Sequence, residues 1–437
     1  MAGGSALFER HLASAEAGDP VAQLNLGNMY RLGYQVRRDP EQAVRWLSLA
    51  AGNGLAEAGE ILRQMGVEPP LPPGGPPRPA PEPAAEADSV DFDGPPPPDP
   101  ATLRRAAEDG LAPAQVALGN ALRQGVGVPA DPVEAVRWYR LAAEQGDADG
   151  QYALAAMYDG GLGVPQNPGE ARLWYHKAAQ QGDAAAQFNL GNMIRQGRGG
   201  AANPEVASKW FRKAAAQGDA AALFALGTMC ETGVGVPRDE ARAVENYRRA
   251  AERGDADAQY NLANMLRQGR GCEADPAEAA GLYLRAALQG VVPAQLNYAL
   301  MLAMGLGGAR DPAAAAHWMR RAAEAGESRA QYLLGVLLAE GRGLAADPAE
   351  ALAWFHKAAA QGDARARYEL GIRHATGQGV AADDVEAHVW LSLAAASGVA
   401  EVAQAAVSAL AAVAARLDSA GLAAAERRRP ARAGDRP

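Results

Sequence analysis

The sequence predicts an all-α fold, a right-handed α-solenoid of stacked helical hairpins that are 36 residues long. A glycine recurs every 36 residues from Gly110 to Gly398, and all seven tryptophans lie 28 residues after a glycine of this series or of its continuation at Gly18. The phrase NLGNMIRQGRG, which begins at Asn189, also returns almost unchanged 72 residues later, at Asn261. A repeat of this length is one supersecondary unit that must stack on its neighbours to bury its apolar face.

The first helix of each hairpin follows the repeating glycine, which we number position 0. In the unit that starts at Gly182, Asp183 stands at position 1, where its carboxylate can accept the free N–H groups of a starting helix. Ala186, Leu190 and Gly191, at positions 4, 8 and 9, recur at helical spacing and share one face. These residues predict a first helix of the form AQFNLGNMIRQ that packs through two apolar positions and one small one.

The second helix is predicted from the turn and capping residues that follow the first helix. A glycine pair at positions 15 and 17, here Gly197 and Gly199, supplies the left-handed backbone of a turn. No Walker lysine and no strand accompanies these pairs, so they are not phosphate loops. Asn203-Pro204 then provides an N-cap and a proline at the first helical position. Apolar residues at positions 25, 28, 29, 32 and 33 form a stripe that only stacking can bury.

The chain divides into five predicted segments. Thirteen of the 29 prolines lie in a linker that can form neither helix nor sheet and that interrupts one hairpin. The segments are a short N-terminal repeat module (1–65), this Pro-rich disordered linker (66–98), the main repeat solenoid (99–397), C-terminal capping helices (398–429) and a disordered tail (430–437).

The unit AAAQFNLGNMIRQGRGGAANPEVASKWFRKAAAQG, from Ala184 to Gly218, resembles the Sel1-like repeat, a relative of the tetratricopeptide repeat. The resemblance recurs over most of the chain. It implies an α-solenoid that serves as a protein-interaction scaffold, with no enzyme activity common to the family. Secreted, cysteine-rich members pair cysteines within each repeat, whereas this chain has only Cys230 and Cys272.

Composition argues against several other functions. A net charge of −9 and a pI near 5.4 argue against general nucleic-acid binding, and no apolar run reaches membrane-spanning length. The six histidines lie in different units without metal-ligand spacing, and no nucleophile motif is present. We therefore expect no enzyme activity, no catalytic residue, no metal and no cofactor. Because the amino terminus does not resemble a secretory signal, the expected location is the cytoplasm.

Two alternative functions stay open at this point. One is an envelope or periplasmic assembly factor, if the true start of the protein lies upstream. The other is a regulatory subunit of an enzyme such as a cell-wall hydrolase. The sequence leaves the identity of the protein partner and the oligomeric state open.

The candidate binding residues lie on one side of the first helix, at positions 7, 10 and 13. First helices of stacked hairpins line the concave surface, and an asparagine offers both a donor and an acceptor to the backbone of an extended peptide. The predicted peptide groove consists of Asn25, Asn28, Asn120, Asn189, Asn192, Asn261, Asn264, Asn297, Arg123, Arg195 and Arg267.

A structural interpretation competes with this one. The asparagines could bond between neighbouring helices, and position 13 alternates between arginine and an acid, so its charges could form ion pairs between repeats. We favour the structural interpretation for the charges. In the carboxyl-terminal repeats the face becomes apolar, which predicts either a hydrophobic partner segment or closing helices that fold back on it. The residues of this apolar groove are Leu300, Met304, Val336 and Ile372.

Overall fold

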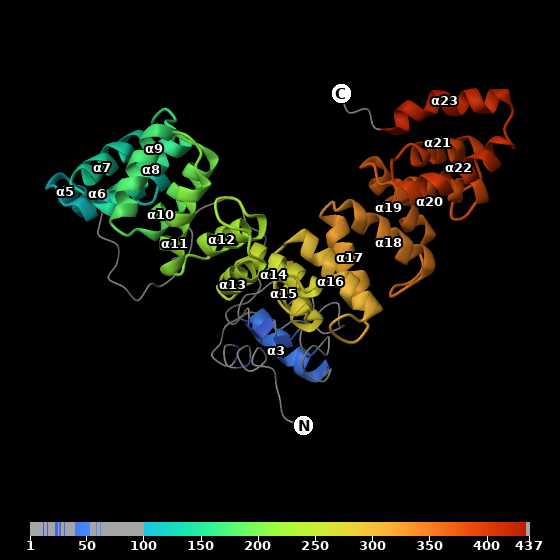
Figure 1. The fold of residues 1–437 in the computed structure, drawn as a ribbon, viewed down its shortest axis with the longest axis horizontal. Coiled ribbons are helices and arrows are strands. Elements are labelled where there is room, and N and C mark those ends of the chain that lie inside the picture. Colours follow the sequence, from blue (N-terminus) through green and yellow to red (C-terminus); the bar gives the residue numbers. More distant parts are fainter. Residues whose placement is uncertain are drawn as a thin grey trace, which may run out of the picture. The chain divides into compact units, whose positions relative to one another are not determined.

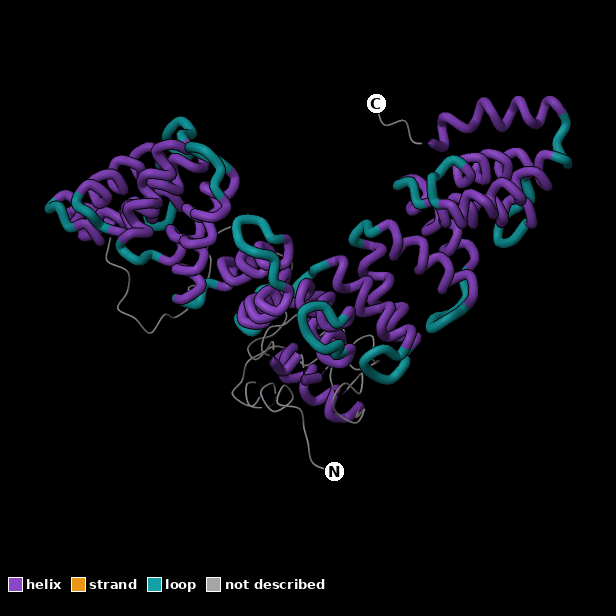
Figure 2. Tube along the Cα trace, viewed as in Figure 1, coloured by secondary structure: helices purple, strands orange, loops and turns teal. Residues whose placement is uncertain are grey.

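The computed structural model describes residues 100–433 without a break, together with 40–52 and a few helical positions before and after that segment, at 12, 15, 22–24, 26–27, 30, 58 and 62. Every regular element in the described part is an α-helix (Figures 1 and 2). The predicted linker 66–98 lies outside the described residues, as do Asn25, Asn28 and residues 434–437. The predicted all-α solenoid of helical hairpins is confirmed for the described residues.

The helices alternate along the chain as the repeat predicts. The first helices of the hairpins are α6 (Ala112–Gln124), α8 (Ala148–Gly160), α10 (Ala184–Gln196), α12 (Ala220–Thr232), α14 (Ala256–Gln268), α16 (Val292–Met304), α18 (Ser328–Glu340) and α20 (Ala364–Thr376). The second helices are α3 (Pro40–Gly52), α5 (Pro100–Glu108), α7 (Pro132–Glu144), α9 (Pro168–Gln180), α11 (Pro204–Ala216), α13 (Glu240–Ala251), α15 (Pro276–Leu288), α17 (Pro312–Glu324), α19 (Pro348–Ala360) and α21 (Asp384–Ala395). Two further helices close the chain, α22 (Ala400–Ala414) and α23 (Ser419–Ala433).

The helices belong to two compact units. One unit comprises Glu86–Val291 and contains α5 to α15, and the other combines Met1–Ala85 with Val292–Pro437 and contains α3 and α16 to α23. Within each unit the two helices of a hairpin pack on one another, and the second helix packs on the first helix of the next hairpin. The predicted main solenoid, 99–397, therefore extends over parts of both units.

Side-chain caps and glycine turns set the helix ends where the sequence places them. Asp183 accepts a hydrogen bond from the backbone N–H of Ala186 at the start of α10, and Asn203 accepts one from Val206 at the start of α11, at 3.0 Å. Gly197 ends α10 in the left-handed conformation, with φ of 75°. Each cap satisfies backbone groups that a helix end leaves without an intrahelical partner.

The core of each hairpin forms where small residues let the two helices approach. Ala186, Leu190 and Gly191 of α10 are buried against Phe211 of α11. A Cβ atom on Gly191 would lie 2.7 Å from Cε1 of Phe211, so this ring would have to shift to admit even an alanine. The close contact explains why position 9 is restricted to Gly or Ala in the predicted pattern.

Glutamines at position 5 join consecutive repeats through buried hydrogen bonds. Nε2 of Gln187 donates to the carbonyl oxygen of Ala179 in the preceding repeat at 3.1 Å, and its Oε1 accepts from Nε2 of Gln217, also at 3.1 Å. The same glutamine pair recurs as Gln115 with Gln145, Gln151 with Gln181, Gln259 with Gln289 and Gln331 with Gln361. A buried amide is costly unless it is hydrogen-bonded. The Gln–Gln pair satisfies the amide within one repeat, and the bond to the carbonyl oxygen of the preceding repeat holds the stacking register.

The chain ends in two helices that pack back on the last hairpin. Helix α22 packs on α20 and α21, and α23 packs on α21. Val413 of α22 is buried in a cluster with Leu391, and Arg428 of α23 pairs with Glu386 at 3.2 Å. Helix α23 continues to Ala433, past Arg429, after which the sequence predicts the tail, because the alanines and arginines of this stretch favour a helix.

Candidate functional site

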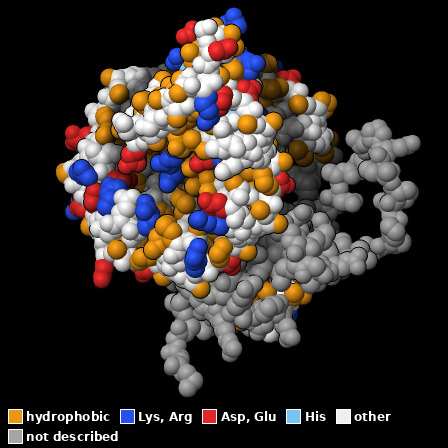
Figure 3. All heavy atoms as spheres, turned by 90° about the vertical axis from the view of Figure 1, so that its right-hand side faces the viewer, with side chains coloured by type: hydrophobic (Ala, Val, Ile, Leu, Met, Phe, Trp, Pro, Cys, Tyr) orange, Lys and Arg blue, Asp and Glu red, His pale blue; other side chains and the backbone are white. Residues whose placement is uncertain are grey.

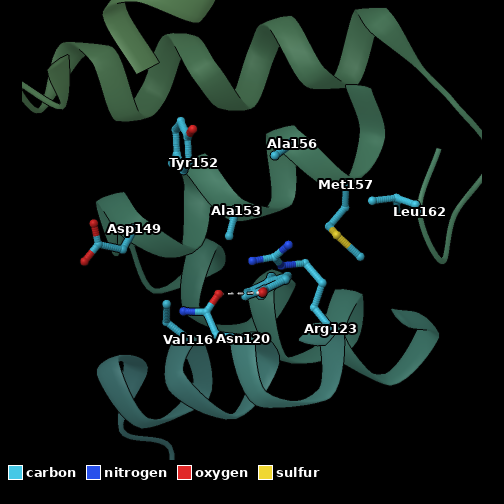
Figure 4. Close-up of a pocket in the computed structure, with 10 residues that line it drawn as sticks. Val116, Asn120, Arg123, Asp149, Tyr152, Ala153, Ala156, Met157 and Leu162 are labelled. Carbon is cyan, nitrogen blue, oxygen red and sulfur yellow. Dashed lines mark hydrogen bonds between the residues drawn. The ribbon is translucent and has the colours of Figure 1, made fainter. Parts of the chain in front are cut away.

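The predicted groove residues of the Glu86–Val291 unit lie along the exposed side of its first helices, which we call the first-helix face. Between α6 and α8 this face contains a pocket of about 410 Å³. Asn120 and Arg123 line it from α6, and Tyr152 and Met157 line it from α8 (Figure 4). The structure thus brings predicted residues of positions 10 and 13 into one hollow.

The asparagines at position 10 differ in what their amides contact. The hydroxyl of Tyr139, at position 29, donates to Oδ1 of Asn120 at 2.8 Å, and the hydroxyl of Tyr283 donates to Oδ1 of Asn264 at 2.7 Å. Burial raises the pKa of Tyr139, so its hydroxyl keeps its proton at neutral pH. Asn120 and Asn264 therefore satisfy buried tyrosines, which supports the structural interpretation for these two residues.

Asn192 is placed differently because position 29 of its repeat is Phe211, which has no hydroxyl. Its Oδ1 accepts from Arg195 at 3.3 Å, and among the described residues its amide N–H groups have no acceptor. Asn189 donates to the hydroxyl of Tyr152 at 3.5 Å, which is a long contact. Among the described residues the amide donors of Asn120 and Asn264 also have no acceptor, so Asn192 differs from them in having no tyrosine hydroxyl to bind.

We expect Asn120→Ala to lower the free energy of unfolding of its repeat by about 1 kcal/mol, because it leaves the hydroxyl of Tyr139 without its acceptor. Asn192→Ala should change it by less than about 0.5 kcal/mol. Hydrogen exchange of α6 and α7 against α10 and α11, with a double-mutant cycle of Asn120→Ala and Tyr139→Phe, measures both effects. Equal losses for the two alanine variants would contradict this assignment.

The charges at position 13 do form ion pairs between repeats, but only the acids take part. Asp159 pairs with Arg198 of the next repeat, and Glu231 pairs with Arg270 of the next repeat at 3.0 Å. Both of these arginines stand at position 16, in the glycine turn. The acidic members of the row are thus neutralised by arginines outside the predicted groove.

The arginines at position 13 have no carboxylate partner in the described part of the chain, because the acids of the row pair with the turn arginines. Arg123, Arg195 and Arg267 are exposed, and across residues 100–433 none of them makes an ion pair with a carboxylate. Arg195 contacts Asn192, and Nε of Arg267 donates to the hydroxyl of Tyr283 at 3.3 Å. The carboxylate that lines the pocket, Asp149, lies at the other end from Arg123 (Figure 4). The row therefore keeps a surplus of positive charge.

An aromatic row at position 6 also lines the first-helix face. Each ring is partly buried and contacts the aromatic ring at position 29 at centroid distances from 5.6 to 6.0 Å. The sequence interpretation missed this row, although a comparison of position 6 across repeats would have revealed it. Its members in this unit are Tyr152, Phe188, Phe224 and Tyr260.

The two remaining predicted residues are asparagines at position 7, Asn261 and Asn297. Asn261 is half-buried on α14 of the Glu86–Val291 unit. Asn297 is half-buried on α16 of the other unit. Within residues 100–433 neither side chain makes a hydrogen bond, so the structure supports neither the ligand role nor the structural one.

The predicted apolar groove residues lie on α16, α18 and α20 of the other unit. Leu300 and Val336 are half-buried, whereas Met304 is 59% exposed. Ile372 packs against the cluster that contains Val413 of α22. At Ile372 the closing helix therefore folds back on the apolar face, as one of the two alternatives predicts.

Acidic, basic and apolar side chains are interspersed on the face shown in Figure 3. Within the described residues, no group of three His, Cys, Asp or Glu side chains is placed to hold a metal ion. None of the described helices is long and apolar enough to cross a membrane.

Comparisons with known proteins agree with this geometry. The family model of the Sel1 repeat matches nine segments of this chain, at 20–55, 112–147, 148–183, 184–219, 220–255, 256–291, 292–327, 328–363 and 364–399. No curated protein matches the chain.

Two solved structures are similar to this chain over most of its length. A Sel1 repeat protein from Oxalobacter formigenes is 32% identical, with a TM-score of 0.53, and the match covers 74% of this chain and 96% of that one. The protein c5321, a protective antigen of uropathogenic Escherichia coli strains that displays an SLR fold, is 29% identical with a TM-score of 0.51, and the match covers 97% of this chain and 94% of that one.

Proposed function

We propose that this chain, which belongs to the Sel1 repeat family, is a non-enzymatic scaffold that holds an extended, acidic segment of a partner protein on its first-helix face. Sel1 repeat proteins generally mediate protein–protein interactions and are typically not catalytic. The proposed contact surface lies on the Glu86–Val291 unit, and the proposed bound segment carries negative charge.

The surplus of arginine on the first-helix face is the observation that carries the proposal. Asp159 and Glu231 would neutralise the row if they paired within position 13, but they pair with Arg198 and Arg270 instead. A guanidinium that has no internal carboxylate is available to one from a partner, and charge complementarity favours an acidic segment over a basic one.

The neighbouring side chains suit an extended backbone. Phe188 offers a half-buried ring beside the unused amide donors of Asn192, so an apolar contact and a backbone hydrogen bond can form side by side. Successive arginines lie two repeats apart, which is roughly 20 Å if neighbouring first helices are about 10 Å apart. An extended peptide spans that length with about six residues.

A cytoplasmic location remains part of this proposal. Cys230 is buried and Cys272 is half-buried, and both are free thiols. Free thiols fit a reducing compartment, where disulfides are rare. We also propose that the linker 66–98 tethers the N-terminal repeat module to the main solenoid.

An array of synthetic peptides tests the proposed function. Each peptide carries two glutamates separated by two to ten residues in a proline- and alanine-rich background, and a matched peptide carries two glutamines. The protein should retain the glutamate peptides, most strongly at a separation of about six residues, and the retention should weaken as salt is raised. Equal retention of the glutamine peptides would overturn the proposal.

A further inference from the structure

A second hollow lies on the other side of the solenoid, between the successive second helices α11 and α13. Its volume is about 310 Å³. It occurs in the repeat that begins at Gly218, where position 28 is Asn246 instead of tryptophan. The residues that line it are Arg212, Ala215, Ala216, Leu226, Cys230, Val236, Pro237, Arg242, Asn246 and Arg249.

The repeat before it shows what tryptophan does at this position. Trp210 lies in the corresponding hollow between α9 and α11, with its ring edge-on to His176 at a centroid distance of 5.6 Å. Ile194 and Val206 add apolar contacts, and Glu170 and Arg172 line the hollow as well. One repeat later, His176 is replaced by Arg212, Ile194 by Cys230, Val206 by Arg242 and Trp210 by Asn246.

The hollow beside Trp210 has a volume of about 640 Å³, so the exchange of tryptophan for Asn246 changes the lining of the hollow and does not open it. Nδ2 of Asn246 donates to the carbonyl oxygen of Arg242 in its own helix at 2.8 Å, so the short side chain folds back on α13. Three arginines from two helices line the hollow, Arg212 of α11 and Arg242 and Arg249 of α13. No carboxylate lines it.

The arginines of this hollow are only partly compensated. Arg242 pairs with Asp239, the N-cap of its own helix, at 3.3 Å. In residues 100–433, the guanidinium groups of Arg212 and Arg249 have neither an ion pair nor a hydrogen bond. Cys230 is 8% exposed, and burial raises the pKa of its thiol, so the floor of the hollow is uncharged at neutral pH.

We propose that this hollow binds the phosphate group of a small ligand. A planar guanidinium matches the oxygens of a phosphate with paired, charge-assisted hydrogen bonds, and donors from α11 and α13 can reach the same group from two sides. Leu226, Val236 and Pro237 give apolar contact area to whatever the phosphate carries. This site is separate from the first-helix face and does not depend on the peptide function.

Phosphorus NMR titrations of the full chain test the proposal. Inorganic phosphate, phenyl phosphate and benzoate are each added at constant ionic strength, which separates a free phosphate, a phosphate ester and a carboxylate on the same ring. Benzoate, which has no phosphorus, is scored by its competition with phenyl phosphate. Asn246→Trp puts a bulky indole beside the arginines that line the hollow, whereas the double variant Arg212→Gln with Arg249→Gln removes two of its three positive charges. The control is Arg137→Gln with Arg329→Gln, which removes two exposed arginines that belong to neither proposed site.

Saturable broadening of the phosphate signal is expected for the wild type and the control. Asn246→Trp and the Arg212/Arg249 variant should each weaken binding at least tenfold, with circular dichroism unchanged. Tighter binding of phenyl phosphate than of inorganic phosphate would identify a phosphate ester as the ligand class, and equal binding would identify free phosphate. Equal broadening in all four proteins, no saturation in the wild type, or tighter binding of benzoate would overturn the proposal.

Discussion

Replacing Arg123, Arg195 and Arg267 together with glutamine is expected to weaken binding of an acidic, extended peptide by roughly a hundredfold. The variant removes the charges that no internal carboxylate compensates, while the ion pairs of Asp159 and Glu231 with the turn arginines stay in place. The fold should be unaffected because the three side chains are exposed. Fluorescence anisotropy with the best glutamate peptide of the array, at low and at high salt, measures the effect.

The matched control is a triple variant that removes the same charge from second helices, Arg137→Gln with Arg212→Gln and Arg249→Gln. These arginines also lack carboxylate partners within the described residues. The control should bind the peptide as the wild type does, apart from a small loss from the changed net charge. If both triple variants lose affinity equally, the protein attracts the peptide only through its overall charge and the first-helix face is not the site.

The repeat made the hairpins predictable because glycine, proline and capping residues act over a few residues. Asp183, Gly197 and Asn203 decide helix ends through their own backbone or a neighbour three residues away. The stacking of hairpins followed from the apolar stripe, since no single hairpin can bury it. The helix-end residues and the need to bury the apolar stripe were therefore enough to predict the fold.

The sequence did not predict which arginine each acid at position 13 pairs with. A row of alternating signs at position 13 suggests pairing along the row, yet Glu231 reaches the turn of the next repeat, where Arg270 stands three residues after Arg267. Which of two nearby arginines a carboxylate meets depends on the offset between stacked repeats, and this offset is a tertiary quantity. The phrase NLGNMIRQGRG contains both kinds of arginine, as Arg195 and Arg198.

The hydrogen-bond partners of the position-10 asparagines were also not predictable from each repeat's own first helix. Asn120 and Asn192 occupy the same position and look equivalent in the sequence, but the residue 19 positions later, Tyr139 or Phe211, decides whether the amide oxygen accepts from a buried tyrosine hydroxyl. A variant that changes Asn192 and Asn264 together would therefore mix a ligand contact with a structural one. Each position-10 asparagine must be interpreted together with position 29.

Gly199→Ala is expected to produce the largest loss of stability of any single substitution argued for this chain, about 3 kcal/mol or more in the free energy of opening its repeat. Gly199 has φ of +69°, where an L-residue is strained, and a Cβ atom would lie 2.2 Å from the carbonyl oxygen of Pro168. That oxygen belongs to the start of α9 in the preceding repeat. The turn would have to move away from α9, which separates two stacked repeats.

Gly398→Ala measures the cost of backbone strain alone, without a clash between Cβ and a neighbouring atom. Gly398 has a similar φ of +75°, and nothing lies within 4 Å of a Cβ atom built there, so its substitution should cost only about 1 to 2 kcal/mol. Because a repeat array need not unfold in one step, hydrogen exchange is the measurement to use, with α9 and α10 compared for Gly199→Ala and α21 and α22 for Gly398→Ala. A loss at Gly199 no greater than that at Gly398 would mean that the turn can shift without parting the repeats. A greater loss, confined to α9 and α10, would show that the second glycine of the pair is needed for stacking as well as for turning the chain.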